Sequence, residues 1–150
     1  MTDYDFVMDT LRRAGRAAAL EVQEAASNLT GTQLNAEAQY IPSFTAACAT
    51  QNMLQRKAGV VCHSAAGRVV RLLQPYDSDI YPQEPEELPA QWGFVWSKDP
   101  AHALPFVPMA TSPYMTGDCC TDGGKIYRSK IDNNVHAPSE YPQGWEEVNV

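Results

Sequence analysis

GDCCTDGGKIYRS, the stretch from Gly117 to Ser129, carries the clearest structural signal in the sequence. Its first five residues suit a half-buried strand, because cysteine and threonine tolerate a pleated surface. Asp122-Gly123-Gly124 then supplies the positive φ angles that a tight hairpin turn needs. The last residues return with a β-branched isoleucine beside a tyrosine. The pattern predicts a β-hairpin, followed by a closing strand in the WEEV run at residues 145–148.

An earlier part of the chain repeats this pattern. The repeat has one extra residue in its turn and four extra residues in the loop before its closing tryptophan. The corresponding positions are Gly59 with Gly117, Cys62 with Cys120, 67–71 with 124–128, Trp92 with Trp145, and Val95 with Val148. Matching glycine turns, basic-apolar-apolar-basic strands and closing tryptophans, all in the same order, predict a tandem duplication.

The last third of the chain resembles the small carbohydrate-binding modules of the chitin-binding family 5/12 type. The resemblance rests on the motif GDxxxDGGKIYR, which begins at Gly117, and on the Gly144-Trp145-Glu146 ending. Modules of this type are small three-stranded β-units found on chitinases and on many bacteriophage virion proteins. The RSKIDNN run at residues 128–134 and the YPQGWE ending are most similar to the phage versions.

The resemblance also implies where a sugar would bind. In the chitinase members, an exposed tryptophan begins a Trp-x-Pro triplet nine residues before the closing tryptophan. His136 occupies that position before Trp145, and Gln83 occupies it before Trp92. Each still precedes an x-Pro pair, but the stacking tryptophan itself is missing. The candidate carbohydrate-binding residues are therefore His136, Tyr141, Tyr81 and Gln83, and the expected core aromatics are Trp92, Trp145 and Tyr127.

The N-terminal region predicts a helix over residues 4–29. Apolar or alanine positions recur every three or four residues, close to a heptad, and Thr2 or Asp3 could cap the start. The stripe consists of Val7, Leu11, Ala14, Ala18, Val22, Ala25 and Leu29. It fits either an amphipathic helix that docks on its own domain or a helix that packs against copies of itself in a short parallel trimer. Arg12, Arg13 and Arg16 are expected to form a solvated face.

The rest of the chain divides at its prolines and composition changes. A second short helix is expected at residues 32–40, and the Ala/Thr/Cys-rich residues 44–53 fit strand or helix. The fold class is α+β: a helical segment over 1–41, a degenerate β-module over 42–96, a proline-rich connector over 97–112 and a second β-module over 113–150. Both modules are expected to be three-stranded and antiparallel.

The bulk composition excludes several classes of function. With 150 residues and a formal net charge of −7, the chain has no basic surplus for a nucleic-acid partner. No apolar run approaches the length of a membrane span, and the N-terminal MTDYD lacks the apolar core of a signal peptide. We therefore expect a protein made in the bacterial cytoplasm, with reduced thiols and no membrane insertion.

The sequence contains few residue patterns that are typical of catalytic or metal-binding sites. His63, His102 and His136 lie in separate segments, and no HExxH, CxxC or GxSxG motif occurs. Neighbouring strand residues point to opposite faces, so one of Cys119 and Cys120 is expected in the core and the other at the surface. The acidic residues of the first copy's long loop, 77–87, are expected to be solvated, with a calcium site as the alternative. We expect no catalytic residue, metal site or cofactor.

Together these features predict a non-enzymatic component of a phage virion, in a tail fibre, head fibre or capsid decoration. Its helix would bind other virion proteins or form a homotrimer, and its modules would attach to host surface glycans. One alternative is a purely structural protein–protein joint in the virion with no sugar ligand. Another is an accessory module of a chitin- or glycan-degrading enzyme.

Overall fold

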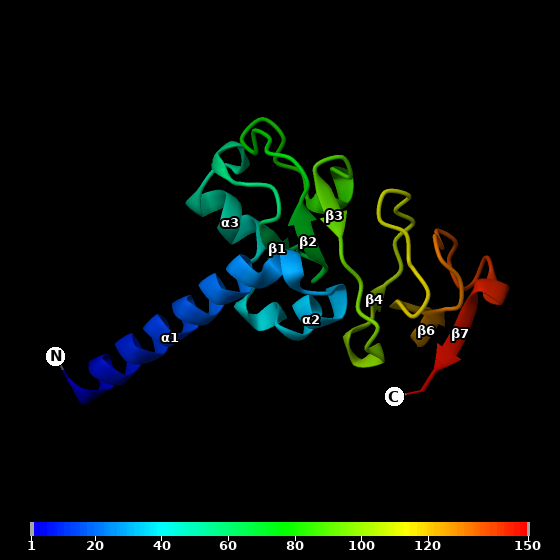
Figure 1. The fold of residues 1–150 in the computed structure, drawn as a ribbon, viewed down its shortest axis with the longest axis horizontal. Coiled ribbons are helices and arrows are strands. Elements are labelled where there is room, and N and C mark those ends of the chain that lie inside the picture. Colours follow the sequence, from blue (N-terminus) through cyan, green and yellow to red (C-terminus); the bar gives the residue numbers. More distant parts are fainter. Residues whose placement is uncertain (1, 150) are drawn as a thin grey trace.

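The computed structural model describes residues 2–149 and shows an α+β fold with a long N-terminal helix and two β-sheets. In Figure 1, helix α1 projects from one side, the first sheet occupies the middle and the second sheet lies at the opposite end. The helices are α1 (Asp3–Ala25), α2 (Gly31–Ala36) and α3 (Phe44–Thr50). The strands are β1 (Val61–His63), β2 (Val69–Leu72), β3 (Trp92–Phe94), β4 (Leu104–Pro105), β5 (Cys119–Asp122), β6 (Lys125–Ser129) and β7 (Trp145–Val148).

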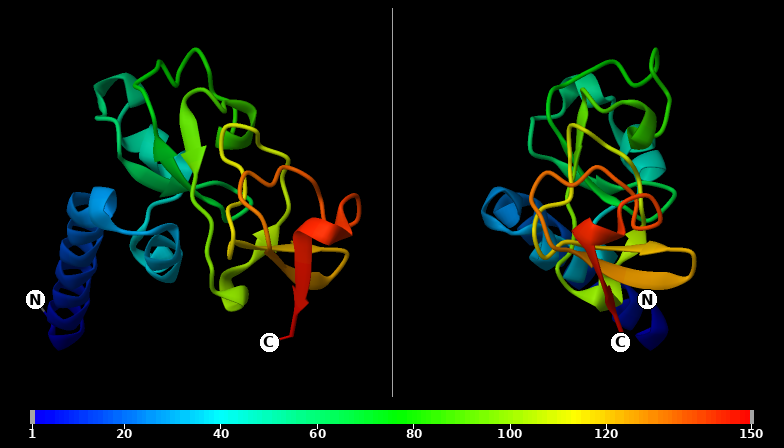
Figure 2. Two further views of the ribbon diagram at one scale, coloured as in Figure 1. Left: turned by 45° about the vertical axis from the view of Figure 1, so that its right-hand side comes forward. Right: turned by 90° about the vertical axis from the view of Figure 1, so that its right-hand side faces the viewer.

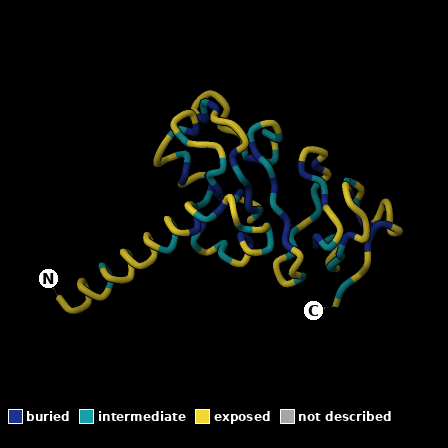
Figure 3. The backbone as a smooth tube through the Cα atoms, in the orientation of Figure 1, coloured by how far each residue is buried: buried dark blue, intermediate teal, exposed yellow. Residues whose placement is uncertain are grey.

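Helix α1 begins with a capping box at Thr2, one of the two residues that the sequence predicts as its cap. The Thr2 hydroxyl accepts a hydrogen bond from the Asp5 amide at 3.1 Å, and the Asp5 carboxylate accepts one from the Thr2 amide at 3.2 Å. After Ala25 the chain tightens into a short 3-10 helix (Ala26–Asn28), close to the predicted end. The N-terminal half of α1 is almost entirely exposed, as Figure 3 shows.

Polar side chains fasten the C-terminal end of α1 to the first sheet. Gln23 forms paired hydrogen bonds with the backbone of Val61 in β1, 2.7 Å to its carbonyl and 3.0 Å from its amide. Arg71 of β2 donates to the Ala26 carbonyl at 2.9 Å, at the end of the helix, where carbonyls lack the amide four residues on. Val22 and Ala26 are buried in the same contact. At this end, the apolar stripe docks on the chain's own body.

The predicted second helix forms as α2, followed by a short 3-10 helix (Ala38–Tyr40). A capping box between Thr30 and Gln33 starts it. The stretch that fits strand or helix in the sequence forms α3, because the Ser43 hydroxyl accepts from the Ala46 amide at 3.1 Å and caps the helix.

The two sheets share one strand-pairing register, which agrees with the duplication read from the sequence. In each sheet the first strand pairs antiparallel with the second, and the second with the closing strand. The equivalent Cα pairs are Cys62–Val70 with Cys120–Tyr127, Val61–Arg71 with Cys119–Arg128, and Leu72–Trp92 with Ser129–Trp145. Every one of these positions corresponds in the sequence alignment of the two copies.

Backbone hydrogen bonds outside the strands repeat as well. Gly59 and Gly117, the first aligned glycines, have φ angles of 100° and 96°. The amide of Gly59 donates to the Leu72 carbonyl at 2.8 Å, and the amide of Gly117 donates to the Ser129 carbonyl at 2.9 Å. Both copies therefore need glycine at this place, because a side chain disfavours positive φ.

The second sheet has four strands rather than the three that the sequence predicts, because β4 joins its edge. Leu104 and Pro105 pair in parallel with Cys120 and Thr121 of β5. Proline is tolerated there because an edge strand needs ladder donors on one side only. The second sheet is therefore mixed, and the three-stranded antiparallel form is that of the first sheet.

We call the sheet of β1–β3 with its surrounding chain the first unit, and the sheet of β4–β7 with its surrounding chain the second unit. The first unit has a counterpart of the edge strand β4. Ser43 forms a single parallel bridge with His63 on the outer side of β1. In both units, the phenylalanine at the end of this edge segment meets the closing tryptophan edge-on. The pairs are Phe44 with Trp92 (centroids 5.7 Å apart, planes at 90°) and Phe106 with Trp145 (6.1 Å, 90°). The repeated unit therefore includes this edge segment, and part of the 97–112 stretch belongs to the second sheet.

One aromatic core runs through both units. The stacked pairs are Phe94–Trp96 (5.6 Å), Trp96–Tyr114 (4.3 Å) and Phe106–Tyr114 (5.3 Å). Ser112 ties the two sides together, since its hydroxyl accepts from the Phe94 amide and its carbonyl from the Trp96 indole, both at 2.9 Å. The 97–112 stretch is thus packed between the units, and both closing tryptophans belong to the same cluster of buried residues.

Cys119 and Cys120 are both buried, which corrects the expectation that one would lie at the surface. Cys120 points into the shared core. The opposite face of β5 is covered by the segment after β3, where the Cys119 amide donates to the Ser97 carbonyl at 2.9 Å and its thiol lies 3.7 Å from the Lys98 carbonyl. The two cysteine side chains do point to opposite faces of β5, as the sequence predicts. The face that was expected to meet solvent is covered by residues 97–98, which lie about twenty residues earlier in the chain.

Candidate functional site

The structure brings together two of the four predicted sugar-binding residues. His136 and Tyr141 lie in the loop between β6 and β7, with ring centroids 5.7 Å apart and planes at 62°. Both are exposed, Tyr141 to 39%. The two rings meet at an angle at the surface and do not form a flat platform.

Buried hydrogen bonds hold this loop. Asn134 is fully buried and donates to the Ser129 hydroxyl at 3.1 Å and to the Gly144 carbonyl at 3.2 Å, while its own side-chain oxygen accepts from the His136 amide at 3.2 Å. The Trp145 indole donates to the His136 carbonyl at 2.7 Å. His136 is therefore fixed from both sides of its backbone.

Tyr141 is positioned by its contact with Gly144. A Cβ atom placed on Gly144 would lie 2.8 Å from the Tyr141 ring, so glycine is required for the ring to lie where it does. The Tyr141 amide also donates to the Ala137 carbonyl at 2.8 Å. The pair therefore rests on a constrained loop.

The first unit lacks this arrangement. Tyr81, exposed to 52%, and Gln83 both lie on the long loop between β2 and β3, and Leu88 occupies the position that corresponds to Tyr141. The Trp92 indole donates to the Tyr76 hydroxyl at 2.9 Å, instead of to a backbone carbonyl. Trp92 and Trp145 are both buried core residues, and Tyr127 packs partly buried against the same core.

The acidic long loop of the first unit is tied to the body through Glu84 and Glu86, while Asp79 and Glu87 are exposed as the sequence predicts. Glu86 accepts from Arg68 at 3.0 Å and from the Ser64 hydroxyl at 2.6 Å. Glu84 accepts from the Ala65 amide at 2.7 Å. Hydrogen bonds from Asn52 and from the loop backbone hold the pKa of Asp77 below its ordinary value. Across residues 2–149, no cluster of three or more histidine, cysteine or acidic side chains has the arrangement of a metal site.

The cysteines lie in environments that suppress thiolate formation. Burial raises the pKa of Cys120 to about 12, and burial also raises that of Cys62 far above its ordinary value. The pKa values of Cys48 and Cys119 are raised for the same reason. Since the thiolate is the nucleophile, these residues act here as small apolar side chains.

Two grooves flank the docked part of α1, and no sequence pattern predicts them because they form between segments that are distant in the chain. One, of about 470 Å³, lies on the α2 side of α1. Its lining residues are Ala18, Glu21, Val22, Ala25, Leu29, Gln33, Ala36, Glu37 and Tyr40. The other, of about 640 Å³, lies between α1 and the chain around Ile41 and Pro42. Neither reaches His136 or Tyr141.

No helix in the described part of the chain combines the length and apolarity that crossing a membrane requires. Comparison with known protein families, with curated proteins and with solved structures found no match to this chain.

Proposed function

We propose that this chain is a non-enzymatic structural component of a phage virion, whose second β-unit attaches to surface glycans of the bacterial host. The proposal rests on the chitin-binding-module motif together with the exposed His136–Tyr141 pair. Aromatic rings stack on the apolar faces of pyranose rings, and polar groups beside them can bond the sugar hydroxyls. In this proposal the first unit is a degenerate copy that supports the second.

The proposal is tested by a glycan array and by pull-down with insoluble chitin and bacterial cell walls. Tyr141→Ala removes the larger stacking surface and is expected to weaken retention about tenfold, the loss of roughly one aromatic contact. His136→Ala is expected to weaken it less. Both residues lie at the surface, so both variants should stay folded, with a small loss of stability for Tyr141→Ala because part of its ring packs on Gly144.

Tyr81→Ala is the matched control, because Tyr81 is also an exposed tyrosine on a loop but belongs to the unit without the pair. Its retention should equal that of the wild type. If no glycan or cell wall retains the wild-type protein above background, or if the three variants behave alike, attachment through this pair is wrong.

The second candidate function is a protein–protein joint inside the virion without a sugar ligand. The angle of 62° between the His136 and Tyr141 rings, and the lack of such a pair in the first unit, favour it. Imaging of the particle separates the two functions, since a joint would bury the His136–Tyr141 loop between subunits and an attachment unit would project it outward.

A further inference from the structure

The two grooves beside α1 differ in charge. Only the C-terminal part of α1 lies against the rest of the chain, as Figure 1 and the left view of Figure 2 show, and this part separates the grooves. Glu21 and Glu37 line the groove of about 470 Å³. Arg56 lines the groove of about 640 Å³, and no acidic residue of the described chain lines it. We call this larger one the Arg56 groove.

The walls of the Arg56 groove are mostly apolar. Helix α1 forms one wall, and the segments before α3 and before β1 form the other. The small or apolar residues that line it are Gly15, Ala19, Leu20, Ile41, Pro42 and Val60. Leu20 is exposed to 60%, so a ligand that covers this groove would remove apolar surface from water, which favours binding.

The polar groups at this groove are few. Gln23 is already engaged, because its side chain forms hydrogen bonds with both backbone groups of Val61. Gln39 and Tyr40 add an uncharged amide and a hydroxyl. An apolar groove with a few polar groups is the usual composition of a small-molecule site, in which the polar groups fix the orientation of the ligand.

Arg56 supplies the charge of the groove, and its counter-ion is missing from the described chain. Its Nη2 donates to the Ala47 carbonyl at 2.7 Å, which is a neutral acceptor in α3. Its Nε is buried and has no hydrogen-bond partner among residues 2–149. None of the ion pairs in this part of the chain includes Arg56. Since Arg56 is half-buried, an anion beside it would offset the cost of removing the guanidinium from water.

Two other arginines also have an Nε without a partner, but their situations differ. Arg68 forms an ion pair with Glu86 at 3.0 Å. Arg71 lines neither groove. Among these three arginines, only Arg56 combines a missing counter-ion with a place at an apolar groove.

The chemistry of the groove fits a ligand with one carboxylate and one apolar chain. A carboxylate accepts charge-assisted hydrogen bonds from a guanidinium, and an alkyl chain packs on the apolar walls. A polyanion would need more than one cation, and an apolar cation would be repelled by Arg56. The volume of about 640 Å³ lies within the range of roughly 300–1,000 Å³ that is common for small-molecule sites.

We propose that the Arg56 groove binds a single-chain amphipathic carboxylate of the fatty-acid class. The carboxylate lies at Arg56, and the alkyl chain runs along the α1 wall over Ala19 and Leu20. This groove does not reach His136 or Tyr141, so the proposal and glycan attachment can fail separately.

The probe for this site is sodium decanoate, titrated into the full chain by isothermal calorimetry below its micelle-forming concentration. Saturable binding of one decanoate per chain is expected. Decyltrimethylammonium has an alkyl chain of the same length and the opposite charge, and it should bind at least about tenfold more weakly, because it lacks the charge-assisted bond to Arg56.

Arg56→Gln tests the role of the charge. It should weaken decanoate binding about tenfold without weakening the binding of decyltrimethylammonium, a selective change that general damage to the fold would not produce. Arg12→Gln is the matched control, because Arg12 is an exposed arginine on the projecting part of α1, and it should leave both affinities unchanged.

Ala19→Phe tests the apolar wall without altering Arg56. The larger side chain fills the groove and should weaken the binding of both probes about tenfold. Ala17→Phe is its control, because Ala17 is exposed on the same helix and lines neither groove, and it should leave both affinities unchanged.

Amide chemical shifts locate the bound decanoate, and changes at Gly15, Gln39 and Val60 are expected. The proposal is overturned if the wild-type chain shows no saturable decanoate binding, or if it binds both probes with equal affinity. Equal effects of a variant and its matched control, or shift changes confined to the groove of Glu21 and Glu37, would overturn it as well.

Discussion

At the scale of single residues, the duplication is most visible where the backbone permits only one residue type. Gly59 and Gly117 have nearly the same positive φ and donate equivalent hydrogen bonds. A Cβ on Gly59 would meet no atom within 4 Å, so any cost of adding one there comes from the backbone and not from a clash. That makes Gly59 a clean probe of the turn geometry.

Gly59→Ala is expected to lower the free energy of unfolding by about 1–2 kcal/mol, because alanine disfavours positive φ. Urea denaturation followed by tryptophan fluorescence measures this. Gly15→Ala is the control: it also adds a Cβ in open space, but in a helix, and should raise helical circular dichroism without lowering the unfolding midpoint. Equal effects of both substitutions would contradict the assigned backbone geometry.

Residue-level reasoning predicted the closing tryptophans and the glycine turns, because these depend on local chemistry that recurs in both copies. It was wrong about Cys119, because the segment that covers this residue comes from the end of the other unit. It brought His136 and Tyr141 together but could not separate them from Tyr81 and Gln83, since that difference depends on how each loop folds back on its own unit.

At the scale of elements, Arg68, the residue just before β2, joins three segments. Its guanidinium donates to Glu86 in the long loop at 3.0 Å and to the carbonyl of Pro105 in β4 at 2.9 Å. The side chains of Arg68 and Glu86 are only 11% and 20% exposed. A partly buried ion pair of this kind is costly to break from one side, because the remaining charge loses its partner.

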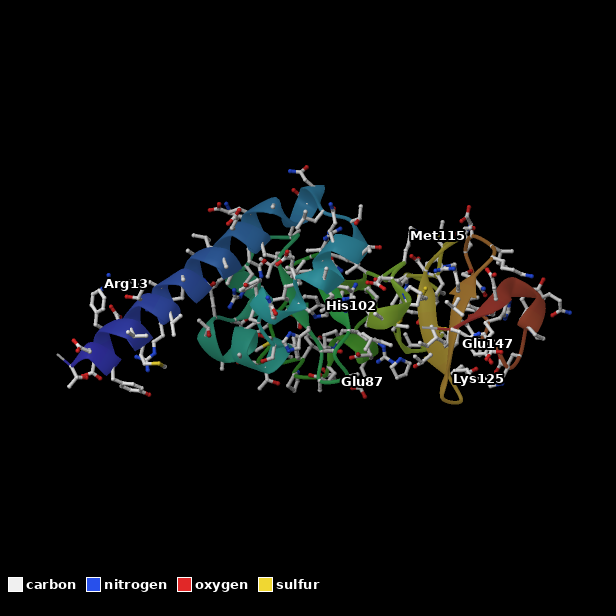
Figure 4. The ribbon with its side chains drawn as sticks, turned by 90° about the horizontal axis from the view of Figure 1, so that it is seen from below. Arg13, Glu87, His102, Met115, Lys125 and Glu147 are labelled. Carbon is white, nitrogen blue, oxygen red and sulfur yellow. The ribbon has the colours of Figure 1, made fainter. Side chains whose placement is uncertain are left out.

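Arg68→Met is therefore expected to destabilise the protein by about 2–3 kcal/mol, somewhat below the value for a fully buried pair. The control is Lys125→Met, which removes an exposed contact at 3.9 Å between Lys125 of β6 and Glu147 of β7. Figure 4 labels these two residues. That loss should stay below about 1 kcal/mol. Chemical denaturation of both variants gives the comparison, and similar losses would show that Arg68 does not join the units.

Helices and strands could be predicted from the sequence where neighbouring residues determine them, and were missed where contacts with distant residues determine them. The hairpin of β5 and β6 closes through Gly123 and Gly124, both at positive φ, as the sequence predicts. Strand β4 was missed because its proline and its neighbours read as a connector, and only pairing with β5 makes it a strand. Helix α3 was ambiguous because its Ala/Thr/Cys-rich residues fit strand or helix, and the structure shows that Ser43 caps it as a helix.

At the scale of the whole molecule, the two units share one hydrophobic core and are not independent domains. The aromatic stack from Phe94 to Phe106 crosses the boundary between them, and both closing tryptophans share its core. We therefore expect one cooperative unfolding transition for both sheets, with coincident curves by fluorescence and circular dichroism.

A chain of residues 113–150 alone is expected to remain unfolded, although the sequence motif lies within it. It lacks β4 and Phe106, and it would expose Tyr114 and Trp145, which Phe106 contacts in the intact protein. A two-dimensional NMR spectrum with poor amide dispersion is the expected result. A well-dispersed spectrum would show that the unit is autonomous.

The stacked rings of Trp96 and Tyr114, 4.3 Å apart, have a consequence for how this protein can change over generations. A crossover after residue 112 would here cut through the interior, exposing indole and phenol faces on both fragments. Changes in the loops that carry Tyr81 and Tyr141 leave this shared interior intact, because both tyrosines are exposed.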